Sequence, residues 1–491
     1  MRLPPQQIQL RAILWMVAAL AMIRLWVMPI ANSFWLDETL IVWAIRGGFG
    51  HILQAVPQTP QSMAFCTIEW LTSLVGGIHE PTLRLPSIAA GIGTLYIFYH
   101  IGFEFIDRSA GLTLAALYIA LQQVAIEVPN ARPYSLALLA EAAALLWLLR
   151  WLRDGRMKYG ILWVTCAVAA GHLHQFFFSV LPLEAGFVVW CAYRQSIVKA
   201  RQLIICGVIG LALSAFAIPQ VSFLSQQAKI LTWPPRPSFF DLLKAFVPKY
   251  VLAMAALLVL PGWFLAKRPR WKPPQSFNAA ALGAIVLLIP TATAFVLSHF
   301  TEFHIFYPRY LLPAVPGLVL FWGWVLHGID SSSVRQLSLI GGLTACTLIT
   351  GGRSLVPDYR QEGWRPAVHS IPESGAMLVF SGLVESQRLD WLEQPLHWGF
   401  LIAPVGAYRP TIQPQDSFVI PFNFNQAGQE YMERLISTRI SQRTVTLVAR
   451  QTPVGPLWTP WISERLGTAG FRLIRDSSYG LVKVEVFQRP R

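Results

Sequence analysis

The sequence predicts an α-helical protein that crosses a membrane many times and ends in a small α/β domain. Of its 491 residues, 54% are hydrophobic and only 13% are charged, whereas a soluble domain usually carries about 25% charged residues. The mean hydropathy is +0.48. Long apolar runs fill the chain up to residue 352, and shorter alternating runs follow. These features exclude an ordinary soluble globular protein.

Apolar runs long enough to cross a bilayer follow one another through the first part of the chain. We expect about 11 spans, which lie near residues 12–30, 84–106, 111–127, 133–150, 160–176, 178–193, 202–222, 250–266, 278–298, 310–328 and 336–352. Residues 61–76 form a further apolar run, but it is short, carries Glu69 and is flanked by Pro57 and Pro60. We therefore expect an interfacial or re-entrant helix there.

Positive charges in short loops predict which side of the membrane each loop faces. Basic residues concentrate at 150–158, 194–201 and 267–272, and lysine and arginine in short loops favour the cytoplasmic side. These loops all fall inside only if residues 61–76 do not cross the membrane. The net charge of +14 therefore reflects membrane topology, and we expect no nucleic-acid partner. With the N-terminal tail inside, an odd number of spans (eleven) places the C-terminal part outside.

The composition changes after about Arg353, which divides the chain into a membrane domain (1–352) and an extracytoplasmic domain (353–491). Val-rich runs lie at 377–380, 418–420 and 444–449, and helical patterns lie at 426–436 and 460–466. Residues 480–487 alternate apolar and polar side chains, which is typical of a half-buried strand. These patterns predict a small α/β domain on the outer surface.

An acidic pair, Asp37-Glu38, follows the first expected span. Carboxylates at the mouth of a span are costly unless they face water or a partner. The pair either marks the end of the span or carries chemistry, and its position alone leaves both interpretations open.

Short motifs recur at the outer ends of other expected spans. They are Leu-Arg-Leu-Pro-Ser at 83–87, Asn-Ala-Arg-Pro-Tyr-Ser at 130–135, Gly-His-Leu-His-Gln-Phe at 171–176, Pro-Arg-Tyr-Leu-Leu-Pro at 308–313 and Asp-Tyr-Arg-Gln-Glu-Gly-Trp-Arg at 358–365. Their order, together with the acidic pair, resembles that of the GT-C class of integral membrane glycosyltransferases. This class includes the protein O-mannosyltransferases, the lipid A aminoarabinose transferases and the Rgt-like family.

The resemblance covers residues 12–370 and continues more weakly through the outer domain. One stretch departs from it, because relatives often have His-Pro-Pro or Lys-Pro-Pro where this chain has Gln58-Thr59-Pro60-Gln61. A lipid-phosphate or metal contact that relatives make there cannot be carried over to this chain.

The resemblance implies transfer of a hexosyl or pentosyl group from a polyprenyl-phosphate donor to an envelope lipid, glycan or protein at the outer face of the inner membrane. Such a transfer needs a base for the acceptor hydroxyl and cations for the departing lipid phosphate. The resemblance implies that Asp37 is the base and that Glu38 orients the acceptor or a neighbouring cation. A single carboxylate that promotes attack opposite the leaving phosphate implies inversion, by analogy with inverting glycosidases.

Three arginines at outer span ends are the candidates for binding the donor phosphate: Arg84, Arg132 and Arg309. Each has a structural alternative, since an arginine can also end a helix and reach the membrane interface. The outer loop 223–249, with Lys229, Arg236, Lys244, Lys249 and the aromatic residues Trp233, Phe239 and Phe240, would form either a gate to the site or a surface that faces lipid headgroups.

Aromatic and histidine side chains near these arginines are expected to line the site: Tyr134, His174, His304 and Tyr310. His172 and His174 have a His-x-His spacing that suits a metal only with a third ligand, and no third ligand is evident. We therefore expect no metal site and no cofactor, although metal-dependent catalysis stays open.

Three other functions stay open at this stage. A lipid-diphosphate-dependent envelope ligase or polymerase would use the same kind of outer site. A transporter or lipid flippase would place ionisable residues near span midplanes and show repeat symmetry, whereas here the charges gather at the outer ends. A non-catalytic assembly protein with the same fold would not need the Asp37-Glu38 pair.

Overall fold

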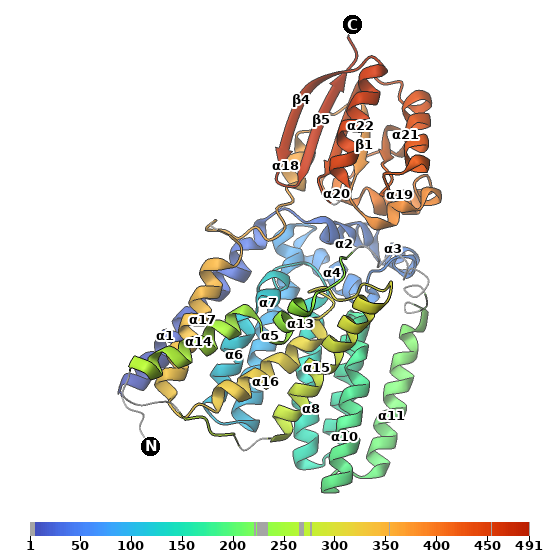
Figure 1. Ribbon diagram of the computed structural model, residues 1–491. Helices are drawn as coiled ribbons and strands as arrows, with labels where there is room; N and C mark the ends of the chain where they lie inside the picture. The colour runs from blue at the N-terminus through green and yellow to red at the C-terminus, as the bar shows by residue number, and fades with distance from the viewer. Residues whose placement is uncertain are drawn as a thin grey trace. The chain divides into compact units, whose positions relative to one another are not determined.

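The computed structural model describes residues 5–219, 222, 234–264, 270–274, 277–352, 354–452 and 454–490, drawn in Figure 1 from blue to red along the chain. The chain separates into two compact units. Unit 1 comprises Met1–Ile30, Pro57–Ile68 and Pro81–Asp358, and unit 2 comprises Ala31–Val56, Glu69–Glu80 and Tyr359–Arg491. Some positions that carry a prediction from the sequence lie outside the described residues: Lys229, Trp233, Arg353 and 267–269.

Unit 1 is built from helices. They are α1 (Pro5–Met22), η1 (Ile23–Val27), η2 (Met28–Ala31), α5 (Glu80–Phe105), α6 (Ala110–Ala120), α7 (Gln122–Glu127), α8 (Tyr134–Asp154), α9 (Met157–Leu173), η4 (Gln175–Ser179), α10 (Leu181–Gln195), α11 (Ala200–Ser214), η5 (Ala215–Ala217), α13 (Phe239–Phe246), α14 (Lys249–Phe264), α15 (Phe277–Phe300), η7 (Leu312–Ala314), α16 (Val315–His327) and α17 (Ser332–Ile349). Each expected span overlaps one or more of these helices. In the described part of the chain, six helices are long and apolar enough to cross a membrane.

The expected span at 111–127 is broken in the structure. Leu121 takes an extended backbone conformation (φ −75°, ψ 120°) between α6 and α7. Gln122 and Gln123 follow Leu121 directly, but apolar residues resume at Val124, so the run as a whole still predicted one continuous span.

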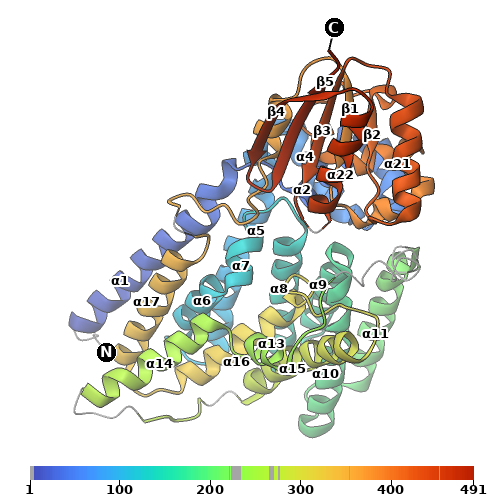
Figure 2. The ribbon, with the colours of Figure 1, turned by 45° about the horizontal axis from the view of Figure 1, so that its top comes forward.

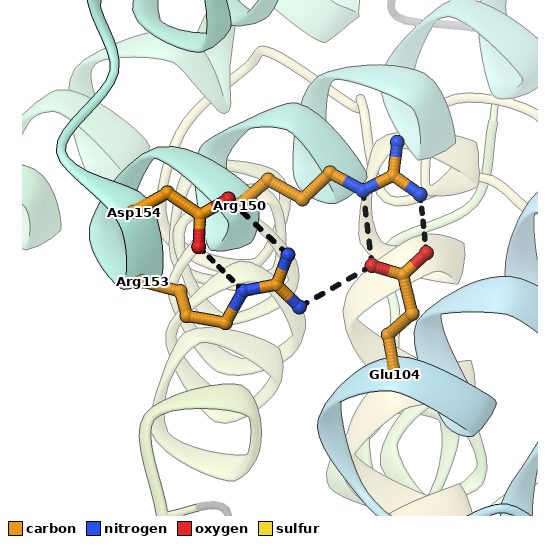
Figure 3. A network of polar contacts seen from close by, with 4 residues as sticks. All are labelled: Glu104, Arg150, Arg153 and Asp154. Carbon is orange, nitrogen blue, oxygen red and sulfur yellow. Dashed lines mark hydrogen bonds and ion pairs between the residues drawn. The ribbon is translucent and has the colours of Figure 1, made fainter.

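The C-terminal ends of α5 and α8 lie together in unit 1. Glu104, near the end of α5, accepts hydrogen bonds from Arg150 and pairs with Arg153 at 3.4 Å, while Arg153 also pairs with Asp154 at 2.8 Å (Figure 3). Helix α8 has 21 residues, so at 1.5 Å per residue its two ends are about 30 Å apart. The segment before Tyr134 therefore lies at the opposite end of the bundle from this network.

Two glycines let α15 and α16 pack with their backbones almost in contact. A Cβ atom on Gly317 would lie 2.6 Å from the Leu287 amide nitrogen, and one on Gly283 would lie 2.8 Å from the Phe321 nitrogen. Small residues allow this approach between membrane helices. The close packing holds the segment before α16, which carries Arg309, next to the end of α15.

The first expected outer loop contains two successive helices, α2 (Leu36–Arg46) and α3 (Gly48–Ala55), which are followed by η3 (Val56–Gln58). The directions of the α2 and α3–η3 segments differ by 119°. The apolar run expected at 61–76 forms helix α4 (Met63–Gly76). Its 14 residues are too few for a perpendicular crossing, which needs about 20 residues.

Unit 2 contains a five-stranded mixed sheet with the order β2-β1-β3-β5-β4 (Figure 2). Its strands are β1 (Ala376–Phe380), β2 (Ser417–Val419), β3 (Thr444–Arg450), β4 (Arg472–Tyr479) and β5 (Val482–Gln488). Strands β2 and β3 are both parallel to β1, whereas β5 runs antiparallel to β3 and to β4. In register, Leu378 lies between Phe418 and Leu447, and Leu447 pairs with Glu485.

The helices of the same domain are α18 (Trp364–His369), η8 (Val384–Gln387), η9 (Leu389–Trp391), α19 (Pro395–Leu401), α20 (Ala403–Gly406), η10 (Pro414–Asp416), α21 (Gln426–Arg439) and α22 (Gly455–Thr468). The expectation of a C-terminal α/β domain is confirmed. Four of the strands and two of the helices, α21 and α22, coincide with the predicted runs. Strand β4 was not predicted, because six of its eight residues are exposed and no alternating apolar pattern marks it.

Candidate functional site

Arg132 lies in the turn between α7 and α8 in unit 1. Its guanidinium group lies over the ring of Tyr134, 5.6 Å from the ring centroid. Tyr134 is the first residue of α8 and is only 2% exposed. Its ring packs edge-on against His174 with a centroid separation of 5.2 Å. The start of α8 therefore positions one cation beside two rings.

Arg309 lies in the segment between α15 and α16. Its guanidinium group lies 5.4 Å from the ring centroids of both Tyr307 and Tyr310. Tyr310 stacks on Phe176 at 4.8 Å, and Phe176 lies 5.7 Å from His174. The second cation therefore also rests on aromatic faces, which attract cations electrostatically.

The two arginines converge on His174. Tyr134, which lies under Arg132, and Phe176, which stacks on Tyr310 under Arg309, both contact this histidine, which is buried just beyond the end of α9. We call Arg132, Tyr134, His174, Phe176, Arg309 and Tyr310 the cation–aromatic cluster. The structure thus brings five of the predicted site residues together in unit 1, from three separate parts of the chain. They are Arg132, Tyr134, His174, Arg309 and Tyr310.

Gln61 is a member of this site that sequence reasoning missed. Its side-chain oxygen accepts a hydrogen bond of 2.7 Å from Arg132, and its side chain is 2% exposed. Ser87 of α5 donates to the backbone carbonyl of Arg132 at 3.2 Å. Gln61 lies in the stretch that departs from the resembling family, so the only available signal was that departure.

Arg84 has a different environment. It is 3% exposed, and one of its Nη atoms donates to the carbonyls of Pro29 and Ile30 at 3.0 Å each. These carbonyls belong to the last turn of the first helical segment, where backbone oxygens lack helical partners. The contacts fit a helix-capping role, and the donor-phosphate role of Arg84 stays a prediction.

Three other histidines near these segments, His172, His299 and His304, contact backbone carbonyls. His304 Nδ1 contacts the Pro234 carbonyl, and His299 Nδ1 lies 2.9 Å from the Pro237 carbonyl. His172 Nε2 lies 3.0 Å from the Leu213 carbonyl, whereas His174 packs on Tyr134. The two rings of the His-x-His sequence therefore contact different residues. Within the described residues, no group of three His, Cys, Asp or Glu side chains is arranged to hold a metal ion.

Asp37 and Glu38 occupy the first turn of α2 in unit 2, which we call the acidic helix start. Glu38 is fully buried and accepts a hydrogen bond of 3.1 Å from the Trp35 amide. Asp37 is half-buried. Negative charge is favourable at a helix N-terminus, where the helix dipole is positive. Burial raises the pKa of Glu69 in α4, and the charge of Glu38 raises it further.

The backbone that leads into α2 is held by side chains of the same unit. The Phe34 amide donates to the Tyr408 hydroxyl at 2.6 Å, and that hydroxyl donates to Glu80 at 2.8 Å. Arg365 pairs with Glu80 at 3.3 Å. Burial raises the pKa of the Tyr408 hydroxyl, and the negative charge of Glu80 adds to this effect. The backbone at Phe34 is therefore held by Tyr408, which Glu80 holds in turn.

No family model and no curated protein matched the chain. Solved structures did match it. ArnT from Cupriavidus metallidurans in the apo state has a TM-score of 0.55 and 12% identity, and the same protein bound to undecaprenyl phosphate has a TM-score of 0.58 and 11% identity. Each match covers 96% of this chain and 97% of that chain.

Arabinofuranosyltransferase AftD from Mycobacteria matches with a TM-score of 0.52 and 16% identity, over 100% of this chain and 40% of that chain. At such identities the likeness concerns the fold. The chain therefore has the fold of the GT-C glycosyltransferases, as its motifs predicted.

Proposed function

We propose that this protein is an integral membrane glycosyltransferase. It would transfer a sugar from a polyprenyl-phosphate donor to a lipid, glycan or protein of the cell envelope. The observation that carries the proposal is the convergence of Arg132 and Arg309 on one aromatic-lined site, in a chain with the fold of ArnT and AftD. One of these structures contains undecaprenyl phosphate, which supports a donor of the same chemical class.

The cation–aromatic cluster suits a lipid phosphate. When the bond between the sugar and the phosphate breaks, negative charge grows on the phosphate oxygens, and two guanidinium groups would stabilise that charge. The rings beneath Arg132 and Arg309 hold the guanidinium planes in place. Tyr134, His174 and Tyr310 would border the sugar or the first isoprene units.

Asp37 would act as the general base of the reaction. It would take the proton from the acceptor hydroxyl as the oxygen attacks the anomeric carbon, and the lipid phosphate would leave from the opposite face with inversion. Glu38 accepts a hydrogen bond from the Trp35 amide, so its role would be to hold the first turn of α2. The positions of Asp37, Arg132 and Arg309 at the outer ends of expected spans support this division of roles.

The topology inferred from basic loops supports action at the outer face of the inner membrane. In that topology residues 353–491 would lie on the periplasmic or extracellular side, where a domain of this size would contact the acceptor. His304, which contacts the Pro234 carbonyl, would border the site from the adjacent loop.

The test is donor consumption by membranes that contain the full-length protein. A panel of radiolabelled polyprenyl-phosphate sugars is supplied with an envelope extract as acceptor, for wild type and for Asp37→Asn. Consumption of one donor by wild type, and its loss in a folded mutant, would support both the class and the base.

Two other outcomes would overturn parts of the proposal. If wild type consumes no monophosphate donor but polymerises or ligates a lipid-diphosphate sugar, the donor class is wrong. If Asp37→Asn consumes the donor as fast as wild type, Asp37 is not the base.

A further inference from the structure

The first turn of α2 is tied to the C-terminal domain by one buried carboxylate. Glu362 is 4% exposed, and its Oε2 atom accepts a hydrogen bond of 2.9 Å from the Leu36 amide. Leu36 is the first residue of α2, so its amide is one of the groups that have no partner within the helix. A side chain 326 residues away in the sequence therefore caps the helix that carries Asp37.

The same carboxylate is held on two further sides. The Trp364 indole donates to Oε2 at 2.9 Å, while Arg450 reaches Oε1 with Nε at 3.0 Å and with a terminal nitrogen at 2.9 Å. Arg450 is the last residue of β3, the middle strand of the sheet. The position of Glu362 is thus fixed by the most central element of the α/β domain.

The segment around Glu362 is itself closely packed against the β4–β5 turn. The Gln361 carbonyl accepts a 2.7 Å hydrogen bond from the Leu481 amide, and the Gly363 amide donates to the Tyr479 carbonyl at 3.1 Å. A Cβ atom on Gly480, whose φ is +62°, would lie only 2.1 Å from the Gln361 oxygen. Only glycine fits this approach, so the turn leaves Glu362 little room to move.

A cation–π contact holds the residue just before α2. The Arg360 guanidinium lies 4.0 Å from the centroid of the Trp35 ring. Residues 360–364 therefore contact both Trp35 and Leu36, and Glu38 returns a bond to the Trp35 amide. These contacts hold residues 35, 36 and 38, which flank Asp37 along the chain.

From this geometry we infer that Glu362 is a positioning residue, which sets the place of the Asp37 carboxylate by capping α2 from the C-terminal domain. The inference rests on the proposed role of Asp37 as the base. A base must be held within a fraction of an ångström, since a displacement of about 1 Å lowers the rate by about 100-fold. It follows that the C-terminal domain contributes to the chemical step through α2, besides any contact with the acceptor.

The test compares Glu362→Ala and Glu362→Gln with Glu485→Gln in the full-length protein. Glu485 of β5 is a matched control, because it is equally buried (4% exposed) and accepts from Ser463 at 2.8 Å within the same domain but lies outside the described contacts of α2. We expect kcat to fall by about 100-fold in Glu362→Ala, with an unchanged KM for the donor. Glu362→Gln keeps an acceptor oxygen for Leu36 and should recover part of this loss.

A merely structural role would lower the amount of folded protein equally in Glu362→Ala and Glu485→Gln, and would leave kcat per folded molecule unchanged. That result would overturn the inference.

A second measurement does not depend on the proposed activity. Amide hydrogen exchange is followed in peptides that cover Leu36–Arg46. Loss of one hydrogen bond to a charged group should speed exchange of the first turn of α2 by about 10-fold or more in Glu362→Ala, and Glu485→Gln should leave it unchanged. Equal exchange in all variants would overturn the capping role. If wild type consumes no sugar donor but the exchange differs as expected, the proposed function fails while the capping by Glu362 stands.

Discussion

The cation–aromatic cluster of unit 1 and the acidic helix start of unit 2 hold charge in opposite ways. In the cluster, Arg132 and Arg309 rest on tyrosine rings. At the helix start, Glu38 and Glu362 are bound by backbone amides, and Glu362 also by an indole and a guanidinium.

This difference follows from the two charges. A guanidinium group is large and weakly hydrated and packs well on aromatic faces, whereas a buried carboxylate needs several donors. We therefore expect the cluster to receive an anion and the helix start to hold a carboxylate in a fixed place.

The largest expected effect is the loss of the base Asp37, which should impair the chemical step and not donor binding. Asp37→Asn should lower kcat by about 100- to 10,000-fold, the usual contribution of a general base, and should leave donor binding unchanged. Asp390→Asn is the control, because Asp390 is an exposed aspartate of unit 2 that pairs with Arg388. Steady-state kinetics with the donor that the panel identifies check the prediction, and a mutant altered only in KM would contradict it.

The next effect concerns the arginines of the cluster. Arg132→Gln and Arg309→Gln should each lower kcat/KM for the donor by about 10- to 100-fold, because each removes a charged hydrogen-bond donor worth about 1.5–3 kcal/mol. The matched control is Arg194→Gln, since Arg194 also rests on an aromatic ring, that of Trp190, but lies in the last turn of α10, at a span end that is expected inside. A loss as large in the control would show that the cluster has no special role.

Arg84 is an arginine at an expected outer span end that donates to two backbone carbonyls. Arg84→Gln should lower the free energy of unfolding by about 1–3 kcal/mol, since the Pro29 and Ile30 carbonyls lose their donor. Thermal unfolding in detergent measures this loss of stability. A fall in donor affinity as large as that of Arg132→Gln, at unchanged stability, would instead support the phosphate role predicted for Arg84.

The smallest expected effect tests the aromatic support of the cluster. Phe176→Leu removes the stacking partner of Tyr310, a contact worth about 0.5–1.5 kcal/mol. Donor KM should therefore rise by about 2- to 10-fold, with little change in kcat. The control is Phe187→Leu, because Phe187 packs on Trp190 in α10 outside the cluster. Equal kinetics for Phe176→Leu and wild type would show that the rings do not position the arginines.

Hydrophobic pattern alone determined most of the architecture. Apolar runs of span length predicted the helices, because a helix in lipid must be apolar along its whole length. Alternation and Val-rich runs predicted β1, β2, β3 and β5. Strand β4 was missed, because an exposed strand at the edge of a sheet carries no such signal. The position of the acidic pair at the end of the first span was also visible in the sequence.

Tertiary structure alone decided which polar side chains meet. Arg132 contacts Gln61, 71 residues away, and Glu362 caps Leu36, 326 residues away. Local patterns report burial, which is a property of each element and its period. A hydrogen bond between distant side chains depends on how the elements pack, so no local pattern distinguishes Arg84, which caps a helical end, from Arg132, which joins the cation–aromatic cluster.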